Sequence, residues 1–232
     1  MNAVVLQRPP ARFAGLDDPD VARTLARLHR KAGGDRWVFL SALPAALGAL
    51  LSGEPVMAAV KPFLRRAFIA VTPDQGRLLY LLARSERSRL IVEFGASFGI
   101  SSIYLAAAAK ANGGRFITTE MEPEKAAAAE RHLAAAGLDD VAQVRWGDAR
   151  ESLAALEGPI DMLFLDGWKD LYVPMVELLA ARLKPGALVL ADNIHTFRKT
   201  LAPFAAHMAD RANGFESATL ALDHGLEVSM RL

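Results

Sequence analysis

The sequence predicts an α/β protein: a doubly wound, mostly parallel seven-stranded sheet with a C-terminal antiparallel hairpin and extra N-terminal helices. Three observations lead to this fold class. From about residue 89, short apolar runs alternate with longer Ala- and Leu-rich segments, which is typical of successive βα units. The end of the chain has two short alternating runs around a turn. The first 70 residues show helical patterns only.

The alternating region predicts five strands, at Leu90–Phe94, Arg115–Thr119, Ala142–Trp146, Asp161–Leu165 and Ala187–Ala191. Helices are expected between and after them, at Ile100–Ala111, Pro123–Ala136, Arg150–Leu156 and Leu171–Leu183. Because a helix connects each strand to the next, the strands should run parallel and be covered on both faces. Pro123 suits a first helical turn, and Gly137 suits a helix end.

The last part of the chain departs from this alternation. A helix is expected at Phe197–Ala212, followed by strands at Ser217–Leu222 and Leu226–Leu232. Asp223-His224-Gly225 lies between these strands and has the composition of a hairpin turn. An antiparallel hairpin therefore completes one edge of the sheet.

The N-terminal part is predicted to be helical, with helices at Asp20–Ala32 and Val56–Ile69. The apolar stretch Ala42–Leu51 is too short to span a bilayer, so we interpret it as a packing helix. We divide the chain into a helical extension, residues 1–70, and a main domain, residues 71–232. The extension is expected either to cap the active site or to form a homodimer contact.

Composition excludes several function classes. With 27 basic and 26 acidic residues the net charge is only +1, which disfavours a nucleic-acid substrate. The absence of cysteine excludes disulfides and thiolate metal sites, so oxygen or imidazole would have to bind any metal. The N-terminus lacks the apolar core of a signal peptide, which predicts a cytoplasmic protein without a membrane partner.

A glycine-containing loop follows the first predicted strand. Gly95 begins the turn Gly95-Ala96-Ser97-Phe98-Gly99, after which a helix would present free backbone N–H groups. Glu120 lies 25 residues after Gly95, at the end of the second strand, where a carboxylate accepts hydrogen bonds from a ribose. Together with Glu93, this order predicts a nucleoside-cofactor site with contacts from Gly95 and Ser97. The alternative is that the glycines only form a tight turn.

The charge of Glu93 bears on which cofactor binds. The spacing E-x-G-x-x-x-G does not match the nicotinamide fingerprint G-x-G-x-x-G. A dinucleotide would also bring a pyrophosphate close to the Glu93 carboxylate, whereas S-adenosylmethionine brings an ammonium and a sulfonium. We therefore predict S-adenosylmethionine. Asp148 follows the third strand and is expected either to accept from the adenine amino group or to be a helix N-cap, and both remain open.

Polar residues end the fourth and fifth strands. Asp166 follows one, and Asp192-Asn193 follows the next. The carboxyl ends of parallel strands meet at the ligand-binding edge of such sheets, so these oxygens should converge there. They suit Mg²⁺ or another divalent cation, and Lys169 nearby is expected to serve as the base. The alternatives are an Asx turn at Asp192 and a solvated helix start at Lys169.

These residues resemble those of a known family. Asp161–Tyr172, which contains Asp-Gly-Trp-Lys-Asp, and Leu190–Asn193 are similar to segments of catechol O-methyltransferases, and more loosely to the cation-dependent O-methyltransferases. The likeness runs from about Val71 to the C-terminus. It implies a Rossmann-like class I methyltransferase fold and methyl transfer from S-adenosylmethionine to a hydroxyl of a small, catechol-like aromatic substrate, assisted by magnesium.

The same resemblance implies roles for individual residues. The metal ligands would be Asp166, Asp192 and Asn193, the catalytic base Lys169, and the cofactor contacts Val71, Glu93, Ser101, Glu120 and Asp166. Two positions depart from the pattern. Gly167 stands where the animal catechol enzyme carries a histidine, and no clear counterpart exists for its C-terminal glutamate. Ala218 falls near that position, with Glu216 two residues away.

Four hypotheses follow from the sequence. The first is a metal-assisted O-methyltransferase, and the second is a metal-independent methyltransferase acting on another small molecule. The third is a nicotinamide-dependent dehydrogenase, which the loop spacing argues against. The last is a non-catalytic donor-binding or scaffold protein, which would leave the oxygen cluster at residues 166, 192 and 193 unexplained.

Overall fold

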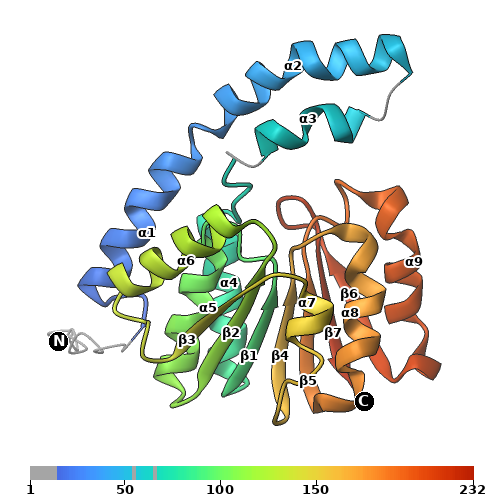
Figure 1. Cartoon of the computed structure of the whole chain (residues 1–232). Coiled ribbons are helices and arrows are strands. Elements are labelled where there is room, and N and C mark those ends of the chain that lie inside the picture. Colours follow the sequence, from blue (N-terminus) through green and yellow to red (C-terminus); the bar gives the residue numbers. More distant parts are fainter. Residues whose placement is uncertain (1–14, 54–55, 65–66) are drawn as a thin grey trace, which may run out of the picture.

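The computed structural model describes residues 15–53, 56–64 and 67–232. Its centre is a seven-stranded sheet in the order β3-β2-β1-β4-β5-β7-β6 (Figure 1). The strands are β1 Leu90–Phe94, β2 Arg115–Glu120, β3 Ala142–Trp146, β4 Ile160–Leu165, β5 Leu183–Ala191, β6 Phe215–Leu220 and β7 Leu226–Arg231. Strands β1 to β5 pair in parallel, while β7 is antiparallel to both β5 and β6. The predicted sheet and its C-terminal hairpin are confirmed.

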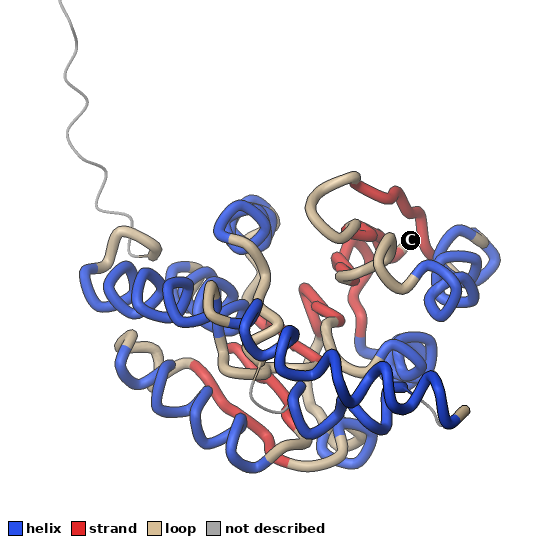
Figure 2. The backbone as a smooth tube through the Cα atoms, turned by 90° about the horizontal axis from the view of Figure 1, so that it is seen from above, coloured by secondary structure: helices blue, strands red, loops and turns tan. Residues whose placement is uncertain are grey.

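Helices cover both faces of this sheet (Figure 2). The α-helices are α1 Pro19–Ala32, α2 Asp35–Ser52, α3 Val56–Leu64, α4 Pro73–Ser85, α5 Ile100–Ala111, α6 Pro123–Ala135, α7 Ala149–Ser152, α8 Tyr172–Leu179 and α9 Arg198–Ala209. Short 3-10 turns lie at Lys169–Leu171, Ala180–Arg182 and Arg211–Asn213. Side chains alternate between the faces: Ile91 packs with α4 and α5, and Val92 with α8 and α9. Both faces of the central strands are therefore buried.

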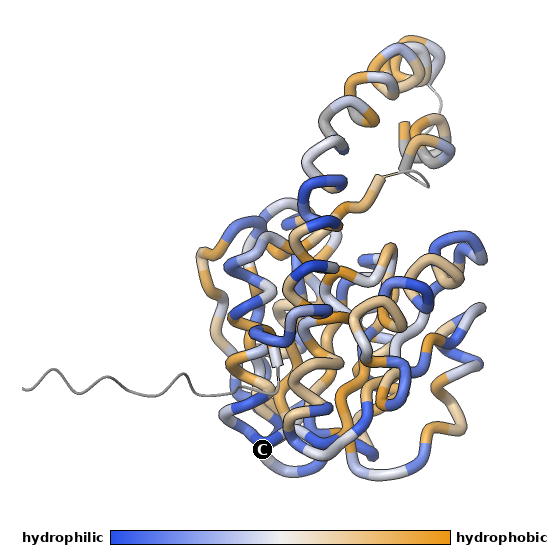
Figure 3. The backbone as a smooth tube through the Cα atoms, turned by 90° about the vertical axis from the view of Figure 1, so that its left-hand side faces the viewer, coloured by the Kyte–Doolittle hydropathy of each residue, from blue (hydrophilic) through white to orange (hydrophobic). Residues whose placement is uncertain are grey.

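The three N-terminal helices differ in how they pack. Helix α1 buries Val21, Leu25 and Leu28 in the same core as α5. Helices α2 and α3 pack against each other and extend away from the sheet (Figures 1 and 3). Leucines on α2 consequently stay exposed, up to 80% for Leu51. Among the described residues, no helix is long and apolar enough to cross a membrane.

Several predicted helix bounds are wrong, because tertiary contacts end the helices early. The helix expected at Arg150–Leu156 is only α7, since Leu153 and Leu156 turn into the core instead of continuing it. The helix expected up to Leu183 ends as α8 at Leu179. Leu183 instead begins β5 by pairing with Ile160.

The segment before α4 is also not helical as predicted. Helix α3 ends at Leu64, and residues 67–72 form an irregular connection. Asp35 supplies the reason, because its carboxylate accepts the backbone N–H groups of Phe68 and Ile69 that a helix would have used internally. In the tail, α9 and β6 also begin and end a few residues away from the predicted bounds.

The strand order changes direction between β1 and β4. Strand β1 leads to β2 on one side, while its other neighbour is β4. Register pairs Phe94 with Leu165 and Leu165 with Ala191, so the three strands end level with one another. Ligands of doubly wound folds bind at such a switch point. The predicted site residues at the strand ends therefore meet here.

Candidate active site

The turn after β1 is built around glycine for a steric reason. Gly95 has φ +101°, and a Cβ there would lie 2.6 Å from the backbone of Gly167. Only glycine lets the turn approach the end of β4 so closely. The amides of Gly95 and Ala96 both donate to the Thr119 carbonyl, which fixes the turn against β2. The loop thereby joins the ends of β1, β2 and β4.

Glu93 lies inside the sheet with no exposed surface. Its Oε2 accepts hydrogen bonds from Ser102 Oγ at 2.5 Å and Thr118 Oγ1 at 2.6 Å. Its Oε1 has no hydrogen-bond partner within the part of the chain that the structure describes. Burial raises the pKa of Glu93 to about 7, although hydrogen bonds from Ser101, Ser102 and Thr118 oppose the rise. The unpartnered oxygen is suited to accept from the ammonium group of a donor.

Glu120 fastens the glycine loop to the end of β2. Its Oε2 accepts the Ser97 N–H at 2.7 Å and its Oε1 accepts the Glu122 N–H at 2.9 Å. Ser97 adopts φ +46°, an unusual backbone conformation for a residue other than glycine. The carboxylate is therefore fixed in place, and its remaining lone pairs are left to accept from a ribose.

A small cavity separates the loop from the segment before α4. It is lined by both sides of the predicted donor site, including Val71, Gly95, Ser97, Ser101 and Asp166. These five predicted contacts thus share one space. That they bind the donor remains a prediction.

Asp148 is the N-cap of α7. Its Oδ1 accepts the Arg150 N–H at 2.8 Å, and its carboxylate forms an ion pair with the Arg150 guanidinium. This guanidinium holds the pKa of Asp148 below its usual value. The capping alternative is thus present in the structure, while the adenine contact remains a prediction.

The metal-ligand candidates lie on neighbouring strand ends. Asp166 N–H donates to Phe94 O at 2.9 Å, and Asp192 N–H donates to Leu165 O at 3.0 Å, which places the two aspartates side by side. Asn193 adopts φ +70° and its Nδ2 donates to Asp192 Oδ2 at 2.9 Å. Burial raises the pKa of Asp166 to about 7, and repulsion from Asp192 and Glu93 adds to it. Burial also raises the pKa of Asp192.

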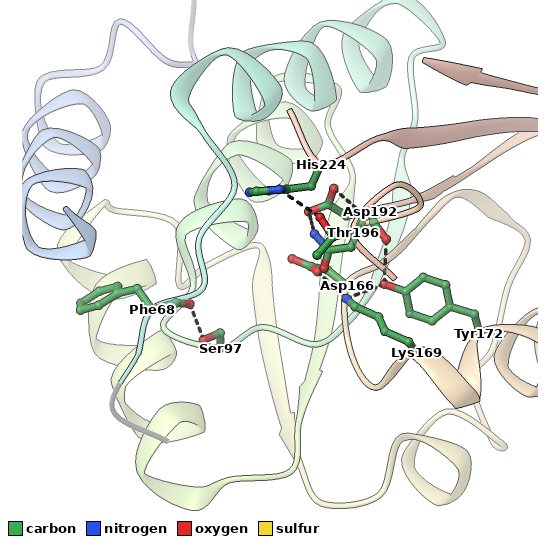
Figure 4. Close-up of polar contacts among 9 residues, drawn as sticks. Phe68, Ser97, Asp166, Lys169, Tyr172, Asp192, Thr196 and His224 are labelled. Carbon is green, nitrogen blue, oxygen red and sulfur yellow. Dashed lines mark hydrogen bonds and ion pairs between the residues drawn. The ribbon is translucent and has the colours of Figure 1, made fainter. Parts of the chain in front are cut away.

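Lys169 lies close to Asp166 and to the ring of Tyr172 (Figure 4). Its Nζ donates to Asp166 Oδ1 at 3.1 Å and to the hydroxyl of Tyr172 at 2.9 Å. The rings of Tyr172 and Phe197 lie 5.2 and 5.7 Å from the ammonium. Tyr172 in turn donates to the Asp192 carbonyl at 3.3 Å. The lysine is therefore largely buried and oriented, as a base needs to be.

The sequence did not predict three residues beside the site. Tyr172 positions Lys169, and the buried Gln75 on α4 lies close enough to Asp192 to lower its pKa, although neither amide atom reaches hydrogen-bonding geometry. His224 in the hairpin turn also lowers the pKa of Asp192, through its charge. Its Nδ1 lies 3.1 Å from Thr196 Oγ1. Tyr172 ends the segment Asp161–Tyr172 that resembles the catechol enzymes, whereas no sequence pattern marks Gln75 or His224.

The two departures from the catechol pattern have structural correlates. A Cβ at Gly167 would lie 2.6 Å from the ring of Phe94, so a histidine there requires this ring to move. Ala218 lies on the edge strand β6, opposite Val228. Glu216 forms an exposed ion pair with Arg211. Neither position therefore supplies the missing glutamate.

Comparisons with known proteins agree with this geometry. Residues 92–194 match the family described as Methyltransferase domain. A catechol O-methyltransferase from Niastella koreensis is 36% identical over 163 residues, which cover 67% of this chain and 73% of that protein. The catechol O-methyltransferase of Mycobacterium tuberculosis is 35% identical over 127 residues, covering 54% of this chain and 57% of that protein.

Solved structures resemble the fold over most of its length. Cofactor-bound Rv0187 from MTB superposes with a TM-score of 0.67 at 27% identity, covering 82% of this chain and 89% of that one. The O-methyltransferase TomG from Streptomyces achromogenes, in complex with SAM, gives 0.63 at 25% identity, covering 82% and 88%.

Fold and site together are those of a class I methyltransferase that uses S-adenosylmethionine. The chain belongs to the S-adenosylmethionine-dependent O-methyltransferase family that includes the catechol O-methyltransferases. This assignment removes the dehydrogenase hypothesis.

Proposed function

We propose that this enzyme transfers a methyl group to a hydroxyl of a small, catechol-like aromatic substrate with assistance from a divalent cation, for which Mg²⁺ is the candidate. The observation that supports it is the pair Asp166 and Asp192, two carboxylates with raised pKa on adjacent strand ends; Asp192 is buried and the Asp166 side chain is only 11% exposed. The Lys169 ammonium forms an ion pair with Asp166. The donor cavity lies directly alongside, because Asp166 also lines it.

The donor set fits a hard cation. Asp166, Asp192 and the Asn193 amide would hold it, since carboxylate and carbonyl oxygens are the ligands that Mg²⁺ prefers. The described residues include no cluster of three or more His, Asp or Glu side chains, so the amide would be part of the set. When bound, the cation lowers the pKa of a coordinated hydroxyl.

The chain's own residues would carry the rest of the reaction. The acceptor oxygen forms its bond to the methyl carbon as the bond from sulfur to that carbon breaks, which requires the two groups to be aligned. Lys169 Nζ would be the atom that receives the hydroxyl proton. Tyr172 keeps Nζ in place through its hydrogen bond, and the Phe197 ring lies 5.7 Å from Nζ.

A metal-independent reaction is the second candidate. The ion pair between Lys169 and Asp166 favours it, because a fixed ammonium already compensates one of the two carboxylates. In that mechanism the lysine and the aspartates alone would orient the acceptor. The substrate would then not need two neighbouring oxygens.

One experiment separates these candidates. Methyl transfer to a panel of diphenols and monophenols is measured with Mg²⁺ or with EDTA, for the wild type and for Asp192→Ala. We expect EDTA and the substitution each to reduce kcat/KM for diphenols by about 100-fold or more, the effect of losing a transition-state charge stabiliser. Asp161→Ala is the control for removing an aspartate, because Asp161 pairs with Lys184 at the opposite strand end. Unchanged rates with EDTA and in Asp192→Ala would contradict the metal mechanism.

We also propose that the N-terminal extension forms a homodimer through α2. Leu40, Leu43, Leu47 and Leu50 recur at heptad spacing and are between 51% and 69% exposed. Such a stripe is self-complementary, so the same helix of a second copy can cover it. Light scattering after size-exclusion chromatography should give twice the chain mass, and Leu43→Glu with Leu47→Glu should give the monomer. A monomeric wild type would contradict the proposal.

A further inference from the structure

We propose that Asp35 is a positioning residue for the methyl donor: its carboxylate fixes the backbone of residues 67–71, which form one wall of the donor cavity. We call this segment the strap. The inference goes beyond the proposed function and requires neither the metal nor a particular acceptor. It requires only that the donor bind at the glycine loop.

Asp35 joins the strap to the start of α2. Its Oδ1 accepts the Phe68 N–H at 3.0 Å, and its Oδ2 accepts the Ile69 N–H at 2.8 Å. Each oxygen of one carboxylate thus accepts a hydrogen bond from one of two consecutive backbone amides. More than 30 residues separate the partners along the chain. The contact is therefore tertiary and not part of the turn itself.

The opposite side of the strap is attached to the glycine loop. Ser97 Oγ donates to the Phe68 carbonyl at 2.8 Å (Figure 4), and the Phe68 ring stacks on Phe98 with centroids 4.4 Å apart. The buried Lys125 donates to the Ala67 carbonyl at 3.1 Å and to Ser97 Oγ at 3.2 Å. The strap is thus fixed between Asp35 on one side and the donor-binding loop on the other.

The backbone of the strap is strained where Asp35 contacts it. Ile69 has φ +46°, and a β-branched residue adopts such a left-handed conformation only rarely. Strained residues persist where their surroundings determine the conformation, and they cluster at ligand clamps. The hydrogen bond to the Ile69 amide is one such determinant. Without it, the strap would relax away from this conformation.

The position of the strap matters for the donor because little space lies beneath it. The cavity between strap and loop has a volume of about 10 Å³, whereas pockets for ligands of this size are on the order of 300–1,000 Å³. The donor therefore needs more space than this cavity has, and an outward movement of the strap would provide it. Asp35 restrains the strap from the start of α2, so it influences how firmly the strap closes over the donor.

A purely structural role for Asp35 would act differently. An acidic residue in the first turn of a helix stabilises that helix through its dipole. Such a role depends on the charge and not on the two strap amides. Asp20 offers a matched control, because it is the first-turn acid of α1 and its carboxylate pairs with Arg23 instead of the strap.

The test compares the wild type with Asp35→Asn, Asp35→Glu and Asp20→Asn in the full chain. The readouts are the Kd of S-adenosylhomocysteine by calorimetry, its dissociation rate by stopped flow, and kcat at saturating donor. We expect Asp35→Asn to raise Kd about tenfold through faster dissociation, with kcat unchanged. Asp35→Glu keeps the helix charge but displaces the carboxylate from the strap, so it should show an intermediate loss. Asp20→Asn should match the wild type.

Three results would overturn the proposal. One is a Kd for Asp35→Asn within twofold of the wild type, and another is an equal loss in Asp20→Asn. The third is a wild-type Kd in Asp35→Glu, which would assign Asp35 to helix stabilisation alone. The binding measurements contain no metal and no acceptor, so their outcome is independent of whether the metal mechanism is correct.

Discussion

The two halves of the active site balance charge in different ways. In the donor half, made of Glu93, the loop 95–99 and Glu120, hydroxyl and backbone N–H groups of nearby elements bind the carboxylates. In the metal half, made of Asp166, Lys169, Asp192 and Asn193, the Lys169 ammonium pairs with Asp166, and the pKa values of both aspartates are raised. Neutral hydrogen-bond donors thus hold the carboxylates of the donor half, whereas the metal half gains from an additional positive charge.

This difference determines what each half can do chemically. Hydrogen-bonded carboxylates position a ligand and change little when it binds. Carboxylates with raised pKa and close mutual repulsion bind a cation with a favourable change in electrostatic energy. Binding of the donor and the chemistry of methyl transfer are therefore separable in this molecule.

The largest effect is expected from Lys169→Met, because it removes the proposed base. General-base catalysis contributes about 10²- to 10⁴-fold, so kcat should fall by that amount while the Kd of S-adenosylhomocysteine changes little. Steady-state kinetics and calorimetry measure the two quantities. Lys110→Met is the control, since Lys110 also pairs with an aspartate but lies at the exposed end of α5. Equal losses in donor affinity and kcat would show that the halves are not separable.

The next effect concerns pH and the buried Glu93. Its pKa is raised in the folded state, so the folded protein binds more protons than the unfolded chain between about pH 4.5 and pH 7. The free energy of unfolding should therefore fall as pH rises through this window, by about 3 kcal/mol from this residue. Denaturant titrations at pH 5 and pH 8 measure the decrease. Glu93→Gln should show a smaller decrease in the free energy of unfolding. The same pH dependence in this variant and in the wild type would contradict a raised pKa for Glu93.

The sequence predicted the local elements of the site better than its long-range contacts for a physical reason. The bounds of β1, β3 and α5 agree with prediction, because strand, glycine turn and helix are specified by consecutive residues. The carboxyl ends of β4 and β5 were also located by their apolar runs. Gln75, His224 and Asp35 approach the site from elements distant in sequence, and no local pattern marks such contacts. The ends of α7 and α8 were missed because core packing determines them.

Gly167 lies where the donor half and the metal half meet, next to Gly95 and the Phe94 ring. Gly167→His should lower the free energy of unfolding by about 1–3 kcal/mol, because the new side chain overlaps the Phe94 ring. Adding Phe94→Leu should recover part of this loss by making room. Thermal unfolding measures both variants, and Gly48→His serves as the control at a position with open space. A single variant as stable as the wild type would mean that Phe94 moves freely, and that the loop and β4 are less tightly joined than they appear.

The smallest effect distinguishes the two roles of Asp148. As the N-cap of α7, Asp148 should contribute about 1 kcal/mol, so Asp148→Ala should lower the unfolding free energy by that amount. Asp148→Asn keeps a capping oxygen and should lose less. Because Arg150 already binds both carboxylate oxygens, we expect Asp148→Asn to change the Kd of S-adenosylhomocysteine by less than about threefold. A tenfold loss of affinity in Asp148→Asn at unchanged stability would instead place this carboxylate against the adenine, and would extend the donor half to the end of β3.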